Sequence, residues 1–180
     1  MDKSNVLESH VVWRETVTRL HADRFHEVSL SHIYGDACAM EMLRNPKAFD
    51  VLLTDNFFGD ILSDEGAMLT GSIGMLPSAC LGAKGANGRF AAVYEPIHGS
   101  APDLAGTGAA NPLAAILCVA MMFRFSFGLE EEAKRIQQAV TRVLGAGVRT
   151  KDLTSGNHRY VSTREMGNSV ISALGELANE

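Results

Sequence analysis

Residues 56–65, with the sequence NFFGDILSDE, decide how the rest of the chain is interpreted. The apolar run 51–53 before them predicts a buried strand, and a helical pattern begins at about Asp60. Asp60 and Asp64 are four residues apart, so a helix places both carboxylates on one face, about 5–6 Å apart. A hard divalent cation would offset their repulsion, because it prefers carboxylate oxygens. From the spacing alone, two solvated acids near a helix start are the simpler interpretation.

The composition is that of an ordinary soluble globular protein. The chain has 180 residues, of which 46% are hydrophobic and 21% charged. A net charge of -5 argues against a nucleic-acid-binding face, and the longest apolar run, 113–123, is about half of a membrane span. No secretory signal is recognised at the start of the sequence. The cysteines are odd in number and far apart, which favours a reducing compartment and a cytoplasmic protein: Cys38, Cys80 and Cys118.

The pattern of apolar residues predicts helices and strands that alternate in the first half of the chain. This alternation favours an α/β fold, whereas the second half is mostly helical around one long loop, 95–112. A break over 71–77 is the expected passage from one structural unit to another. Helices are expected over residues 5–23, 36–43, 60–70, 112–123 and 130–144 and after a capping box at 162–165, and strands over 28–34, 50–55 and 90–94.

Two further charged residues are candidates for chemistry. Asp36 stands at a predicted strand-to-helix turn; alone it indicates a helix N-cap. Together with Asp60 and Asp64 it gives three acids at strand ends, where α/β sheets place ligands. Three carboxylates without a nearby histidine suit magnesium or manganese better than zinc. Lys3 is either a solvated terminal lysine or a buried lysine that moves a proton.

The loop 95–112 is the candidate ligand-binding segment of the second half. Its GTGAAN stretch, 106–111, only weakly matches GxGxxG, and no predicted strand leads into it. Small residues there would let the backbone approach a flat or phosphorylated ligand closely. Asp103 either accepts from ribose hydroxyls or is a turn aspartate. His98 either contacts the ligand or holds the loop together.

Four blocks of the chain resemble the isocitrate and isopropylmalate dehydrogenase family, in the order in which that family has them. They are DKSNVLE (2–8), DACAM (36–40), NFFGDILSDEGAMLTGSIGM (56–75) and EPIHGSAPDLAGTGAANP (95–112). The resemblance covers nearly the whole chain and implies that family's α/β fold, incomplete, with only its C-terminal half present. Residues 1–76 would be part of the dimer-forming, metal-binding domain. Residues 77–180 would be the C-terminal segment of the NAD-binding domain.

The resemblance implies a metal and proton-transfer site shared between two chains. Asp60 and Asp64 match the magnesium-binding aspartates of one subunit. Asp36 matches a catalytic and metal-binding aspartate that completes the site from the partner. Lys3 matches the catalytic lysine, which also reaches across the dimer. Apolar residues of the helices near these acids are expected to pack against the second chain: Met40, Met42, Leu43, Met68 and Leu69.

The resemblance also implies a cofactor site. Asn5 and Val6 match residues near the substrate and the nicotinamide. Asp103 followed by Leu104, in place of a Lys-Tyr pair, indicates NAD rather than NADP. Six residues match those that hold the adenosine half of NAD: His98, Gly99, Ser100, Ala101, Asp103 and Asn111.

The implied activity is magnesium- or manganese-dependent oxidative decarboxylation of a 2-hydroxy acid with NAD. The block MLTGSIGMLPSA, 68–79, is most similar to the branch that acts on 3-isopropylmalate in leucine biosynthesis. Relatives acting on tartrate, homoisocitrate or isocitrate, or a catalytically silent partner subunit, are the alternatives. The family's first half supplies substrate-binding arginines and a tyrosine. We therefore expect this chain to be inactive alone and to work as a homodimer or with the missing N-terminal half.

Overall fold

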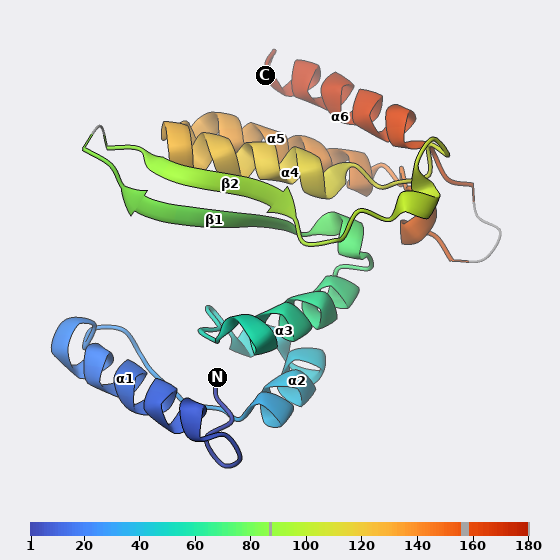
Figure 1. Ribbon diagram of the computed structural model, residues 1–180. Coiled ribbons are helices and arrows are strands. Elements are labelled where there is room, and N and C mark those ends of the chain that lie inside the picture. Colours follow the sequence, from blue (N-terminus) through green and yellow to red (C-terminus); the bar gives the residue numbers. More distant parts are fainter. Residues whose placement is uncertain (87, 156–158, 180) are drawn as a thin grey trace. The chain divides into compact units, whose positions relative to one another are not determined.

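The computed structural model describes residues 1–86, 88–155 and 159–179. The chain forms two compact units, Met1–Leu69 (unit 1) and Thr70–Glu180 (unit 2), which are shown in Figure 1. The assignment of residues 1–76 and 77–180 to two domains of a longer fold stays a prediction.

Unit 1 is built from three helices around a small apolar core. The helices are α1 (Glu8–Arg24), α2 (Gly35–Arg44) and α3 (Asn56–Leu69). A short 3-10 turn, Pro46–Ala48, follows α2, which cannot continue through Pro46 because proline has no N–H to donate. The buried residues of the core come from the N-terminus, α2 and α3: Met1, Cys38, Met42 and Leu62.

The segments 28–34 and 50–55 were predicted to be strands, and that prediction is wrong. Both are extended connections outside any sheet, apart from one parallel bridge between Asp2 and Tyr34. A strand needs a ladder of backbone hydrogen bonds to a neighbour. Among the described residues the segment 1–2 lies alongside both, but it offers only the bridge to Tyr34 and one hydrogen bond from the Met1 ammonium to the Leu53 carbonyl, which are too few for a ladder. The apolar patterns of these segments therefore could not indicate whether they pair in a sheet.

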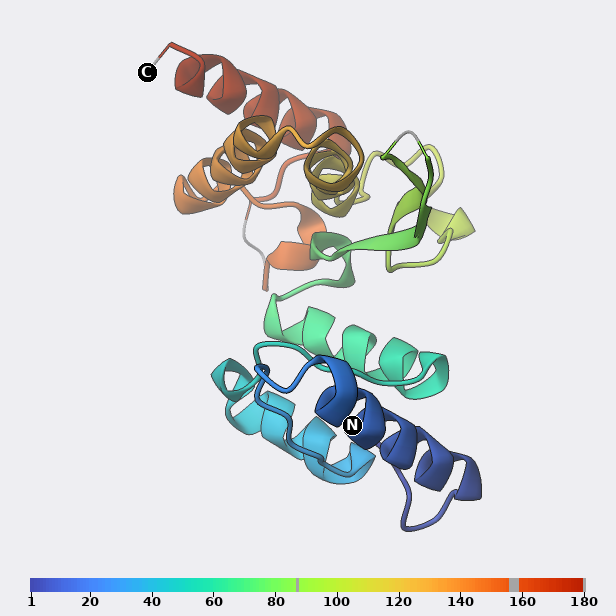
Figure 2. The ribbon, with the colours of Figure 1, turned by 90° about the vertical axis from the view of Figure 1, so that its left-hand side faces the viewer.

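Unit 2 is a hairpin packed on helices. Strands β1 (Pro77–Lys84) and β2 (Phe90–Pro96) pair antiparallel, with Pro77 opposite Pro96 and a bulge between Leu81 and Lys84. Figures 1 and 2 show the hairpin against α4, with α5 and then α6 stacked beyond it. The helices of unit 2 are α4 (Leu113–Met122), which continues into a π-helical turn (Phe123–Phe127), α5 (Glu130–Gly145) and α6 (Thr163–Leu177).

The sequence predicted these helices and β2 but not β1. The apolar stripe of α5 is buried: Ala133, Ile136, Val140 and Val143. Leu113, Met166 and Val170 share the core of unit 2 with Val140 and Val143. The predicted capping box is present: Ser162 accepts from the Glu165 N–H, and the Glu165 carboxylate accepts from the Ser162 N–H. β1 was missed because its small residues and glycine carry no strand signal.

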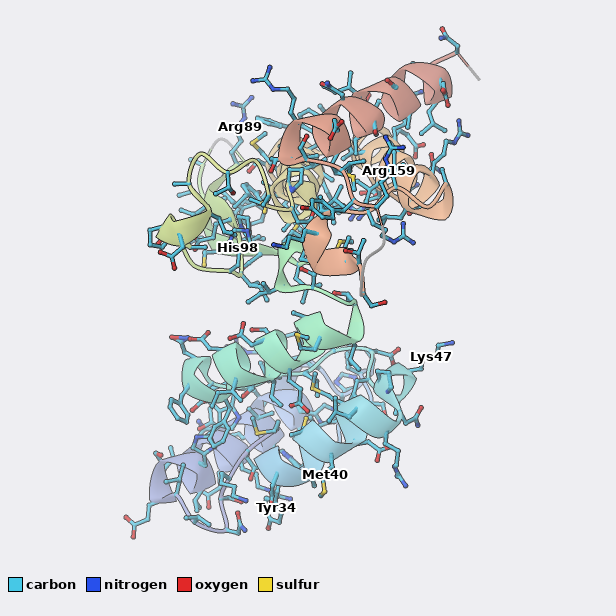
Figure 3. All side chains as sticks on the ribbon, turned by 90° about the vertical axis from the view of Figure 1, so that its right-hand side faces the viewer. Tyr34, Met40, Lys47, Arg89, His98 and Arg159 are labelled. Carbon is cyan, nitrogen blue, oxygen red and sulfur yellow. The ribbon has the colours of Figure 1, made fainter. Side chains whose placement is uncertain are left out.

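Four of the five apolar residues expected to contact a second chain lie on the surface of their unit. The exposed fraction is 67% for Met40, 58% for Leu43 and 67% for Met68, and Leu69 is also exposed. Figure 3 shows the Met40 side chain extending outward from α2. Met42 differs, because it is buried in the core of unit 1. Among the described residues no helix has both the length and the apolar character needed to span a bilayer.

Candidate functional site

Lys3 and Asp36 form an ion pair in unit 1. Lys3 Nζ lies 2.8 Å from Asp36 Oδ1, and the lysine side chain is 21% exposed whereas that of Asp36 is 68% exposed. Lys3 is therefore a partly buried cation rather than a freely solvated terminal lysine. The hydrogen bond from Lys3 lowers the pKa of the Asp36 carboxyl from its ordinary value.

Backbone bonds next to Lys3 bring it to the start of α2. The Asp2 N–H donates to the Ile33 carbonyl at 3.0 Å, and the Gly35 N–H donates to the Asp2 carbonyl at 2.9 Å. Asp36 follows Gly35 directly, so its carboxylate comes within reach of the lysine. The Asp2 side chain is buried and accepts from the Ser4 N–H at 3.0 Å. Burial opposes ionisation of Asp2, but the bonds from Ser4 outweigh it and lower the Asp2 pKa.

Asp60 and Asp64 lie on α3 as the spacing predicted, with both side chains exposed. The helix begins at Asn56, earlier than expected, so neither acid is in its first turn. The helix dipole therefore compensates their charge less than the sequence suggested. Asn56 Nδ2 donates to Asp60 Oδ1 at 3.0 Å, which orients that carboxylate. It is Asp55 that caps α3, by accepting from the Phe58 N–H at 3.0 Å.

The three acids of the predicted metal site are not one cluster within this chain. Among the described residues no three carboxylate, imidazole or thiolate side chains gather where they could hold a metal ion. Asp36 is instead paired with Lys3, which the resemblance places on the same side of the site. Asp60 and Asp64 offer exposed carboxylate oxygens on neighbouring turns of one helix. That donor chemistry fits a hard cation which keeps part of its water shell.

Asn5 and Val6 lie in the turn that follows Lys3. Both are exposed, Val6 with a fraction of 69%, and the Val6 N–H donates to the Lys3 carbonyl at 3.0 Å. Their side chains are therefore presented to solvent from the same short segment as the lysine.

Unit 2 contains a cavity of about 460 Å³ beside the loop 95–112. Five of the six predicted adenosine-site residues line it: His98, Gly99, Ser100, Ala101 and Asn111. His98 lies on the loop after β2 (Figure 3), and its Nδ1 is 2.9 Å from the Gly99 carbonyl. Because a carbonyl can only accept, that nitrogen carries the proton. Asp103, the sixth residue, is exposed in the 3-10 turn Pro102–Leu104 and is not among the lining residues, whereas Leu104 is.

The weak GxGxxG match is a loop of small residues, as the alternative interpretation held. Gly106 and Gly108 adopt φ of 77° and 68°, which side chains rarely adopt, and open space surrounds both. The preceding segment contains a strained position, since Ala101 has φ of 41°. Small residues on either side of the two glycines line the cavity: Ala105, Ala109 and Ala110.

Asp152 organises one wall of this cavity, and the sequence did not reveal it. Its Oδ2 accepts from Asn111 Nδ2 at 3.0 Å and from the Ser72 hydroxyl. Asn111 Oδ1 accepts in turn from the Leu113 N–H at 3.0 Å, at the start of α4. Burial opposes ionisation of Asp152, but the hydrogen bonds from Ser72 and Asn111 outweigh it and lower its pKa. The Asn111 side-chain amide is thus used within the protein, where it fixes the loop at the cavity wall.

Comparison with known proteins identifies the family. The family model described as isocitrate/isopropylmalate dehydrogenase matches residues 1–170. The chain belongs to this family. A 3-isopropylmalate dehydrogenase from Ruegeria pomeroyi is 59% identical over 176 residues, which are 97% of this chain and 47% of that protein. One from Rhodospirillum rubrum is 55% identical over 179 residues, 99% of this chain and 48% of that protein. The chain spans about half the length of these relatives.

Solved structures agree with the expected fold. An isocitrate dehydrogenase from Methylococcus capsulatus has a TM-score of 0.82 and 36% identity, covering 96% of this chain and 49% of that one. A beta-decarboxylating dehydrogenase from Thermococcus kodakarensis has a TM-score of 0.80 and 34% identity, covering 98% and 49%. The prediction of an incomplete α/β fold of this family is confirmed.

Proposed function

We propose that this chain supplies the lysine, metal and adenosine-binding half of an enzyme that oxidatively decarboxylates 3-isopropylmalate with NAD. The ion pair between Lys3 and Asp36, with 2.8 Å between Nζ and Oδ1, is the observation that carries the proposal. It joins a partly buried ammonium to a carboxylate at two of the positions that the family resemblance assigns to catalysis. Identities above 50% to proteins named 3-isopropylmalate dehydrogenase support the choice of substrate.

Once its ammonium has released a proton to water, the neutral Lys3 amine would take the proton of the substrate hydroxyl while hydride passes from the same carbon to NAD. The ammonium formed on Lys3 is stabilised by the Asp36 carboxylate, which already accepts a hydrogen bond from it. Asp60 and Asp64 of one chain, with Asp36 of a second chain, would hold a magnesium or manganese ion. When bound, such an ion polarises the hydroxyl and stabilises the negative charge that develops on oxygen. In this proposal the functional assembly is a homodimer, since the acids of one chain do not form a cluster of three.

The cavity of unit 2 takes the adenosine half of NAD. Its lining of glycine, alanine and serine lets the backbone approach a flat adenine closely. Asp103 precedes Leu104, which lines the cavity, and its carboxylate would accept from ribose hydroxyls and repel a 2′-phosphate. NAD is therefore preferred to NADP.

The test uses a chimeric enzyme, because this chain spans about half the length of its relatives. The matched half of the Ruegeria pomeroyi relative is replaced by residues 1–180 of this chain. Initial rates of NAD reduction are then measured with magnesium and with 3-isopropylmalate, isocitrate, homoisocitrate or tartrate. We expect the highest kcat/KM with 3-isopropylmalate, a preference for NAD over NADP, and loss of the rate in EDTA.

Two results would overturn the proposal. One is a chimera that folds and dimerises but oxidises none of the four acids. The other is a chimera that prefers a different acid, which would move the substrate assignment to another branch. Asp60→Asn is the matched variant for the metal, because it keeps the side-chain volume and removes the charge. It should raise the magnesium concentration needed for half-maximal rate.

A further inference from the structure

His10 is a buried polar residue of unit 1 to which the proposed function gives no role. All residues of α1 are described, and of these His10 alone is buried, with an exposed fraction of 4%. Neighbouring apolar residues on the same helix, such as Val12 with 63%, remain exposed. Burying an imidazole costs free energy unless its ring nitrogens find partners. The partners of His10 therefore explain why a polar ring occupies this position.

Both ring nitrogens of His10 have partners, and these determine its tautomer. Nδ1 lies 3.0 Å from the backbone nitrogen of Lys3, which donates its N–H to the ring. Because a backbone N–H can only donate, Nδ1 carries no proton. The proton is then on Nε2, which lies 2.9 Å from Asp55 Oδ2 and donates to it. His10 is a neutral bridge between Lys3 and Asp55.

Asp55 extends this bridge to the start of α3. Its other oxygen, Oδ1, accepts from the Phe58 N–H at 3.0 Å. The Phe58 ring also packs edge-on against the imidazole, with 5.4 Å between ring centroids and an interplanar angle of 77°. The main chain of Lys3 is thereby connected to the N-terminus of the helix that carries Asp60. All of these groups lie within unit 1.

We propose that His10 is a positioning residue for Lys3. Its unprotonated Nδ1 holds the Lys3 main chain, and its Nε2–H, anchored on Asp55, fixes the lysine relative to the start of α3. The hold itself is a property of this chain, whereas its effect on turnover rests on the proposed function. Misplacing a reacting group by about 1 Å can cost on the order of a hundredfold in rate. Lys3 contacts Asp36 through a long, flexible side chain, so a fixed main chain limits where Nζ can go.

The other bonds near Lys3 do not replace this one. The Lys3 carbonyl accepts from the Val6 and Leu7 N–H groups at 3.0 and 2.9 Å, which closes the following turn. The Asp2 N–H donates to the Ile33 carbonyl, and the Asp2 carbonyl accepts from the Gly35 N–H at the start of α2. These bonds fix the residues on either side, but the donor of Lys3 itself goes to the histidine. His10 therefore holds the N–H end of the Asp2–Lys3 peptide unit, whose carbonyl end accepts from the Gly35 N–H.

Two substitutions separate the two bonds of the ring. In His10→Asn, the amide oxygen stands where Nδ1 was and still accepts from Lys3, but the bond to Asp55 is lost. In His10→Gln, the longer amide reaches Asp55, but no acceptor faces the Lys3 N–H. His26→Gln is the control, because the His26 side chain is 78% exposed. Each variant is prepared both in the 180-residue chain and in the chimeric enzyme.

The first readout is spectroscopic and independent of activity. Nitrogen-15 NMR of the His10 ring in the 180-residue chain should show the Nε2-protonated tautomer. Hydrogen exchange at the Lys3 amide should accelerate about tenfold in His10→Gln and remain close to the original in His10→Asn and His26→Gln. A ring protonated on Nδ1, or equal exchange in all three variants, would overturn the hold of His10 on Lys3.

The second readout is turnover in the chimera. His10→Gln should lower kcat by about tenfold to a hundredfold with little change in KM, and His10→Asn should retain most of kcat. If both variants lose kcat only in proportion to their lowered stability, His10 is structural and the positioning role is wrong. If the unmodified chimera is inactive, the proposed function fails, while the NMR result still decides whether His10 holds Lys3.

Discussion

Gly74 lies against Asn111 at the wall of the unit 2 cavity, and this contact predicts the effect of Gly74→Ala. A Cβ at this position would lie 2.8 Å from Asn111 Cβ and 3.2 Å from its Nδ2. The first distance is 0.6 Å below 3.4 Å, where ordinary contact begins. Asn111 cannot turn aside freely, because its amide is bonded to Leu113 and Asp152. Overpacking of this kind costs about 1–3 kcal/mol, so we expect the free energy of unfolding to fall by about 2 kcal/mol.

Urea denaturation followed by circular dichroism measures this loss as a lower transition midpoint at an unchanged slope. The matched control is Gly167→Ala in α6, where no atom lies within 4 Å of the new methyl group. Removing a helix-interior glycine there should stabilise the protein by about 0.5–1 kcal/mol. Because Asn111 lines the cavity, Gly74→Ala should also weaken binding of adenosine nucleotides. An unchanged midpoint for Gly74→Ala would refute the close packing of Gly74 on Asn111.

Three further perturbations test other parts of the molecule. Asp152→Asn removes a carboxyl whose pKa is lowered on folding. The Asp152 carboxylate therefore stabilises the folded protein above its unfolded pKa of about 3.9, and this stabilisation is lost as the pH falls through the lower folded value. The variant should be about 1 kcal/mol less stable near neutral pH, since this side chain is partly exposed, and urea midpoints measured across the acid range should converge with those of the unmodified protein. Ser162→Ala removes one half of the capping box of α6 and should cost about 1 kcal/mol in thermal unfolding. A thiol reagent should modify exposed Cys80 in the folded protein but Cys38 and Cys118 only after unfolding, because both are buried. Burial also raises the pKa of the Cys38 thiol, which lowers its reactivity. Mass spectrometry after timed quenching identifies the modified residues.

Local sequence signals were sufficient for the helices and insufficient for the extended segments. The capping box at Ser162 and the stop at Asn45-Pro46 act within a few residues, so both are visible in the sequence. A strand depends on a partner that can be anywhere in the chain. Residues 50–55 have the expected apolar pattern, yet no described segment pairs with them, whereas β1 pairs with β2 despite its small, weakly patterned residues.

In the candidate site, too, some residues carry local sequence signals and others depend on partners that are distant in the sequence. Asp36, Asp60 and Asp64 were singled out by their positions in the sequence and, with Lys3, by the family blocks, and their roles stay predictions. His10 and its partner Asp55 are 45 residues apart in sequence, and no spacing rule connects an imidazole to a carboxylate across that distance. The one available signal was a histidine on a helix face where an apolar residue would be expected, and that pattern alone indicates burial rather than a role.

The contacts of Asn111 show how its side chain is used, which the resemblance alone did not indicate. The sequence places it among the residues that hold adenosine, and the structure places it at the cavity. Yet its amide oxygen accepts from the Leu113 N–H, and its amide nitrogen donates to Asp152. Both functional ends of the side chain are therefore occupied in keeping the loop attached to α4 and to the Asp152 segment. The shape of this cavity wall therefore depends on Asp152, which lies outside the family blocks, and on Ser72, which lies within the block 56–75 but had no expected role.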